Sequence, residues 1–289
     1  MKIIDSHVHF FDLSKGEYHW LKPENPPFWS DKKRIANNVS ERDLVVSDSM
    51  NLAGFVHIEA GFNNQAPWQE IAWLEASCKS PFRAVANINL TLNPEKFQQQ
   101  IKQISAYASV VGCRHILDSQ AVELLTSEQV KNNFSALNKA KLNFEVQMPF
   151  SNKKAVNALN TIVKNNPNIS FIINHAGSPL SNSGEVSEAS LWYQGLAIIA
   201  ENNNVAIKCS GWEMVNRHYS FDWCKTIINH CLTLFGTQRV MLSSNFPLTR
   251  LSCSYQTYWQ AMLSVVTSSL NECQHNLLHN NSKFWYKFP

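Results

Sequence analysis

Charged side chains are scarce in this sequence of 289 residues. Asp, Glu, Lys and Arg make up 16% of the chain, against about 25% in average proteins, which argues against a charge-driven disordered protein and a long coiled coil. The longest basic run is Lys32-Lys33-Arg34, too short for a nucleic-acid-binding stripe, and no apolar run approaches the roughly 18 residues of a membrane span. We therefore expect no nucleic-acid partner and no membrane partner. The charge-poor surface permits self-association without requiring it.

Cysteine and glycine motifs are also missing. The seven cysteines form no CxxC pair, which indicates reduced thiols rather than a disulfide framework. Met1-Lys2 leads at once into an apolar run, so we expect no signal peptide and a cytoplasmic location. The alternative to a barrel, an open doubly wound sheet, would place a glycine-rich phosphate loop after the first strand, and no such loop is present.

Short apolar runs are what the sequence has instead. Eight of them, rich in Val, Ile and Phe, predict buried strands, and segments with helical spacing lie between many of them. Buried strands that alternate with helices predict a parallel sheet, and eight in a chain of this length predict one (β/α)8 barrel domain over residues 1–289. The predicted strands are 3–10, 53–60, 83–90, 110–117, 143–149, 169–176, 204–211 and 239–247. The predicted helices are 68–77, 94–107, 127–140, 155–165, 191–201 and 223–235.

Polar side chains gather where the predicted strands end. A barrel filled only for packing would end its strands in aliphatic residues, and the active site of this fold lies at the carboxyl ends of the strands. The sequence therefore predicts a functional site there. Its candidate residues are His7, His9, His57, Glu59, Arg114, Gln147, His175, Lys208 and Asn245.

His7 and His9 alternate on one strand, so both side chains face the same way. Two imidazoles at a barrel mouth can chelate one divalent ion, and Asp5 would orient them from deeper in the barrel. The alternative is a pair of structural histidines. His175 could join them as a ligand, or act as an acid or base, or only cap the turn that follows it.

The remaining candidates each allow two interpretations. Glu59, which alternates with His57, is either a general base or ligand, or the buried partner of a cation. Arg114 would bind a carboxylate of a small anionic substrate, with Gln147 as a further substrate-binding candidate, and Lys208 would polarise a carbonyl. Both cations could instead be internal ion-pair partners. The long irregular segment 11–49 is expected to cover the pocket.

Several motifs occur in a specific order: Asp5-Ser-His-Val-His-Phe10, Asn174-His-Ala-Gly-Ser-Pro179 and Ser243-Ser-Asn-Phe-Pro247. With the segments 112–117, 205–211 and 277–288, the chain resembles the amidohydrolase superfamily. It is most similar to the lactonase-type branch, which includes L-fuconolactonase, L-rhamnonolactonase and 2-pyrone-4,6-dicarboxylate lactonase. The resemblance spans essentially the whole chain. It implies a distorted (β/α)8 barrel that hydrolyses a C–O bond in a small lactone or carboxylic ester.

The resemblance also implies one divalent metal ion, with Zn first, held by His7, His9, His175 and the residue that ends strand eight. Lactonases that need no metal also occur in this branch, so a site without a metal ion is the alternative. The usual Asp of strand eight is Asn245 here, and an amide cannot take a proton from water, although its carbonyl oxygen can still ligate a metal or position a water. Glu59, His57 or His175 is then the candidate base. A binding barrel that has lost its base, or a decarboxylase of the same superfamily, is the alternative.

Overall fold

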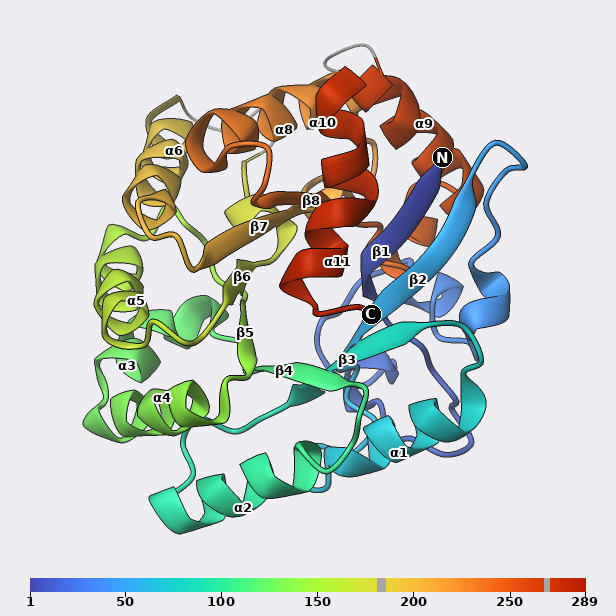
Figure 1. Ribbon diagram of the computed structural model, residues 1–289. Coiled ribbons are helices and arrows are strands. Elements are labelled where there is room, and N and C mark those ends of the chain that lie inside the picture. Colours follow the sequence, from blue (N-terminus) through green and yellow to red (C-terminus); the bar gives the residue numbers. More distant parts are fainter. Residues whose placement is uncertain (181–185, 268–270) are drawn as a thin grey trace.

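The computed structural model describes residues 1–180, 186–267 and 271–289. Eight parallel strands follow one another in sequence order, each hydrogen-bonded to the next, and helices surround them (Figure 1). The predicted (β/α)8 barrel is thus confirmed. The strands are β1 (Lys2–Val8), β2 (Asn51–Ile58), β3 (Phe82–Asn87), β4 (Val110–Arg114), β5 (Asn143–Val146), β6 (Phe171–Ile173), β7 (Val205–Cys209) and β8 (Val240–Leu242).

Each strand ends before the predicted run does. β8, for example, ends at Leu242, whereas the apolar pattern continues to residue 247. His175 and Asn245 have left-handed backbones, with φ of 52° and 57°, which ends the extended conformation after β6 and β8. Most candidate residues therefore stand in the first turn after a strand rather than on it.

The helices cover the outside of the strands. The six predicted helices are confirmed in position, with shifted ends in most cases: α1 (Trp68–Ser77), α2 (Pro94–Ile104), α4 (Glu128–Ala140), α5 (Lys153–Asn165), α6 (Val186–Ala200) and α8 (Phe221–Phe235). Asn93 caps α2 by accepting a hydrogen bond from the Lys96 N–H. The structure adds α3 (Ala121–Thr126), α7 (Trp212–Val215), α9 (Tyr255–Thr267), α10 (Asn271–His275) and α11 (Asn281–Trp285). None of the helices in the described ranges has the length and hydropathy that crossing a bilayer requires.

The C-terminal segment forms the floor of the barrel, at the amino ends of the strands. α11 lies across this end in Figure 1. Trp285 and Tyr286 pack against inward-facing residues of several strands, among them Val56, Ile172 and Met241. Burying aromatic side chains of this size contributes strongly to core stability. The opposite end of the barrel is left for the candidate site.

β1 and β8 close the barrel without a regular ladder. In the described chain they are joined by one bridge between Val8 and Phe246 and by the hydrogen bond from the His9 N–H to the Phe246 carbonyl, 2.7 Å. Asp5 adds a second connection, because its carboxylate accepts from both the N–H and the hydroxyl of Ser244. The barrel is therefore irregular between β1 and β8.

The buried Asp5 carboxylate predicts a pH-dependent stability. Burial raises its pKa from 3.8 to about 6, although hydrogen bonds from Ser244 oppose the shift. The folded protein therefore holds a proton that the unfolded chain releases, so the contribution of Asp5 to stability is fully present below pH 4 and is lost as the pH rises to 6. At 1.36 kcal/mol per pKa unit the loss is about 3 kcal/mol. Urea unfolding of Asp5→Asn should show a correspondingly flatter profile between pH 4 and 7; an unchanged profile would contradict this assignment.

Candidate active site

Three imidazoles meet where β1 and β6 end. Nε2 of His7 lies 3.2 Å from Nε2 of His9, and the ring centroids of His7 and His175 are 4.7 Å apart. On the other side of His7, the ammonium of Lys208 lies 3.0 Å from Nδ1. The structure thus brings together four residues that the strand-end pattern singles out.

Lys208, His7 and His9 form a chain of hydrogen bonds in which each residue donates to the next. Nδ1 of His9 lies 2.8 Å from the Ile58 carbonyl, which only accepts, so this nitrogen carries the proton and Nε2 has the lone pair. Lys208 has a pKa of about 8, lowered by burial, so it is mostly charged at neutral pH and donates to Nδ1 of His7. His7 must then hold its proton on Nε2 and donate it to His9. The result is a chain of donors from Lys208 through His7 and His9 to the carbonyl.

This chain decides how well the residues fit a metal ion. The 3.2 Å between the two Nε2 atoms matches the separation of about 3.3 Å expected for neighbouring ligands on tetrahedral zinc. His7 does not fit while Lys208 is charged, because its Nε2 then carries the proton. Residues 1–180, 186–267 and 271–289 contain no group of three His, Cys, Asp or Glu side chains placed to share an ion. As the side chains stand, the predicted set does not form a metal centre, and an ion requires Lys208 to release His7.

Lys208 lies in a fully buried ion pair. Its Nζ atom is 2.6 Å from Oε2 of Glu145 on β5, and both side chains have no exposed surface. Nζ also contacts the Ser6 carbonyl at 3.4 Å and His7, so its three N–H groups are directed at protein atoms. Of the two interpretations of Lys208, this geometry favours the internal ion-pair partner.

Arg114 holds a second buried ion pair closer to the mouth. Its Nε donates to Oε1 of Glu59 at 2.8 Å, one terminal nitrogen donates to the Glu59 carbonyl, and the other donates to Oε1 of Gln147. These bonds use three of its five N–H groups. Burial raises the pKa of Glu59, and the guanidinium opposes that rise. Arg114 is therefore oriented by Glu59 and keeps donors for a further acceptor.

His57 lies outside this arrangement. The Phe10 N–H donates to its Nδ1 at 3.3 Å, so its proton is on Nε2, which donates to Glu70 of α1 at 2.9 Å. Both ring nitrogens are therefore engaged between β2 and the helix that covers it. This geometry favours a structural histidine over a base.

His175 is held by its neighbours from the end of β7. Its Nδ1 lies 3.0 Å from the Ser210 hydroxyl, and a Cβ atom on Gly211 would come within 2.4 Å of the same nitrogen. Gly211 thus leaves the space that the ring occupies. Burial and the charges of Lys208 and Arg114 lower the pKa of His175 to about 3, so the ring is neutral at physiological pH. The residue as a whole is half-buried.

Glu213 on α7 was not among the predicted site residues. Nδ2 of Asn245 donates to its Oε1 at 2.6 Å, and both side chains are buried. Burial raises the pKa of Glu213 to about 7. In the sequence Glu213 follows the end of strand seven by one helical turn, and extending the strand-end search by that turn would have found it.

The long segment after β1 is fastened to the loops that follow β7 and β8. Nε of Arg217 donates to Asp31 at 2.9 Å, and Arg250 donates to Asp43 at 3.0 Å. Both acidic residues belong to segment 11–49 and both arginines to the far loops. These contacts support the expectation that segment 11–49 covers the pocket.

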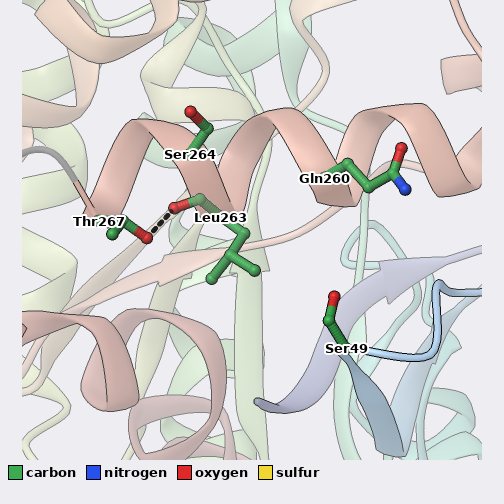
Figure 2. Close-up of a pocket in the computed structure, with 5 residues that line it drawn as sticks. All are labelled: Ser49, Gln260, Leu263, Ser264 and Thr267. Atoms are coloured by element: carbon green, nitrogen blue, oxygen red, sulfur yellow. Dashed lines mark hydrogen bonds between the residues drawn. The ribbon is translucent and has the colours of Figure 1, made fainter.

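A separate surface hollow of about 480 Å³ lies beside α9. Figure 2 shows its lining, which carries no ionisable side chain and includes Thr267 bonded to the Leu263 carbonyl. The lining residues are Ser49, Gln260, Leu263, Ser264 and Thr267. Without an acid, base or cation it offers no chemistry comparable with the barrel mouth.

Comparisons with known proteins agree with this architecture. The chain is 23% identical to the uncharacterized protein y4mH of Sinorhizobium fredii (strain NBRC 101917 / NGR234), over 99% of this chain and 98% of that protein. Among solved structures, an amidohydrolase from Burkholderia multivorans with bound zinc has a TM-score of 0.81 at 17% identity, with both chains fully covered. A probable 2-pyrone-4,6-dicarboxylic acid hydrolase from Acinetobacter baumannii, with citric acid bound, has a TM-score of 0.73 at 17% identity and full coverage of both chains. The amidohydrolase family model matches residues 4–288, and the chain therefore belongs to the amidohydrolase family.

Proposed function

We propose that this protein hydrolyses a small lactone or carboxylic ester that carries an anionic group. The observation that supports it is the meeting of three imidazoles with an oriented guanidinium at the carboxyl ends of the strands. Ester hydrolysis needs a hydrogen-bond donor for the carbonyl oxygen, which gains negative charge, and a general base that takes a proton from the attacking water. The mouth of this barrel offers both.

Arg114 is the proposed donor. Its orientation by Glu59 fixes the guanidinium, and its remaining N–H groups suit a carboxylate or a lactone carbonyl. Gln147, which shares a hydrogen bond with Arg114, would contact the same part of the substrate. The citric acid bound to the Acinetobacter relative is a small carboxylate, which supports an anionic substrate for this chain.

His175 is the proposed proton acceptor. The lone pair of His57 and the carboxylate of Glu59 are engaged by Phe10 and Arg114, whereas His175 is half-buried as a residue and its ring lies beside that of His7. Burial, and after it the charges of Lys208 and Arg114, hold its pKa low, which makes it a weak base in the free protein. An anionic substrate beside these cations would offset the part of the lowering that their charges cause, and the ring would then accept a proton more readily.

A panel of lactones, assayed with and without added Zn²⁺ or Mn²⁺, tests the proposal. We expect hydrolysis of at least one lactone that bears a carboxylate. No hydrolysis in either condition would contradict the proposal and favour a binding barrel. Because the Burkholderia relative binds zinc, the metal content of this protein should be measured by elemental analysis alongside the lactone assay. About one ion per chain, with activity lost in His7→Ala, would establish a metal-assisted form, and no metal with unchanged activity in His7→Ala would exclude it.

A further inference from the structure

Asn245 and Glu213 form a buried amide–carboxylate pair at the mouth. The 2.6 Å between Nδ2 and Oε1 is at the short end for an N–H donor, as expected when the acceptor is charged. In its ionised form, which prevails above a pH of about 7, the Glu213 carboxylate only accepts, so the amide turns its nitrogen toward it, as observed. The orientation of the Asn245 carbonyl oxygen is thereby fixed.

That carbonyl oxygen is left without a partner. Oδ1 of Asn245 and Oε2 of Glu213 are both buried and have no hydrogen-bond partner among the described residues. A buried acceptor without a donor is costly, and at a functional site it indicates a group that binds there. Asn245 is also next to the histidine pair, because the residue after it accepts the hydrogen bond from the His9 N–H.

We infer that Glu213 and Asn245 act as one unit in place of the strand-eight Asp of related enzymes. Glu213 supplies the negative charge and holds the amide, and Asn245 presents its carbonyl oxygen to the substrate or the attacking water. Glu213 is thus a positioning residue that acts through Asn245. The inference rests on the proposed hydrolase function and names a residue that its chemistry requires.

The same geometry explains why residue 245 is not Asp. An Asp there would bring a second carboxylate to about the 2.6 Å that now separates Nδ2 from Oε1. Two carboxylates so close in a buried site cannot both ionise. In this protein the carboxylate therefore stands on α7, one hydrogen bond away from the end of β8.

Three variants test the unit: Glu213→Gln, Asn245→Asp and the double exchange Asn245→Asp/Glu213→Gln. Glu213→Gln keeps an acceptor for Asn245 but removes the charge. We expect its kcat to fall at least tenfold, with KM within about threefold and an unchanged Tm, because positioning by charge affects the reaction more than binding. Asn245→Asp should lower both kcat and Tm, since it pairs two carboxylates.

The double exchange restores one amide and one carboxylate. We expect its Tm to return to the wild-type value and its kcat to be at least tenfold higher than that of Asn245→Asp. Such a result would be strongly non-additive. Glu128→Gln, at an exposed ion pair, is the matched control and should change neither quantity. Unchanged kcat in Glu213→Gln, or no recovery in the double exchange, would overturn the inference. If wild type hydrolyses none of the lactones, the proposed function fails, and the Tm values alone still test the pair.

Discussion

Replacing Lys208 with Met is expected to lower the free energy of unfolding by about 3–5 kcal/mol. The substitution keeps most of the side-chain volume but leaves Glu145 without its cation at a position with no exposed surface. Tyr286 donates to the other carboxylate oxygen of Glu145, and one hydroxyl cannot replace a full charge. Urea unfolding at pH 7 measures the change.

Lys131→Met provides the matched control. Lys131 and Glu128 are also 2.6 Å apart, but both side chains are exposed, so the expected loss is below about 1 kcal/mol. Adding Glu145→Leu to Lys208→Met should recover much of the stability, because removing both charges is far less costly than removing one. Equal losses in Lys208→Met and Lys131→Met would show that the buried pair is not ionised in the folded protein.

Arg114→Lys is expected to reduce kcat/KM by about 10²-fold on lactones that carry a carboxylate, since a single ammonium cannot reproduce the planar fork of donors. The loss on neutral lactones should be at least tenfold smaller. Lysine keeps a positive charge beside Glu59, so Glu59 is not left without a cation. The loss of kcat/KM then measures how well the substrate carboxylate is bound. Steady-state kinetics on matched charged and neutral lactones measure the difference.

Arg83→Lys serves as the control for this experiment. Arg83 donates to the Lys287 carbonyl at the floor of the barrel, remote from the mouth, and its replacement should leave kcat/KM within about twofold. Equal losses on charged and neutral lactones in Arg114→Lys would contradict a substrate-binding role and leave only the ion pair with Glu59.

The strands could be predicted from the sequence because parallel strands buried on both faces are continuous apolar runs. Their ends could not, since the same runs continue into turns such as the one at Asn245. α3 and α7 are too short for a helical period to show. α9 does carry the signal, because Tyr255, Tyr258, Trp259 and Met262 are buried at helical spacing.

Strand position indicated which residues gather at the mouth, but not what each one faces. Whether Lys208 meets a substrate or a carboxylate depends on Glu145 on another strand, two crossovers earlier in the chain. His57 shows the same limit, because its ring contacts Glu70 of α1 instead of joining the histidine cluster. Partners that are distant in sequence decide these roles, and no local pattern encodes them.

The floor made by Trp285 and Tyr286 has a consequence for how the protein is made. Synthesis proceeds from β1 at roughly 5–20 residues per second, so tens of seconds separate the first strand from these two aromatic residues. During that interval the emerging chain has an open strand edge and an uncovered apolar interior. The barrel can therefore reach its final packing only after nearly the whole polypeptide has been synthesised, and until then its exposed strand edge and apolar interior are prone to aggregation.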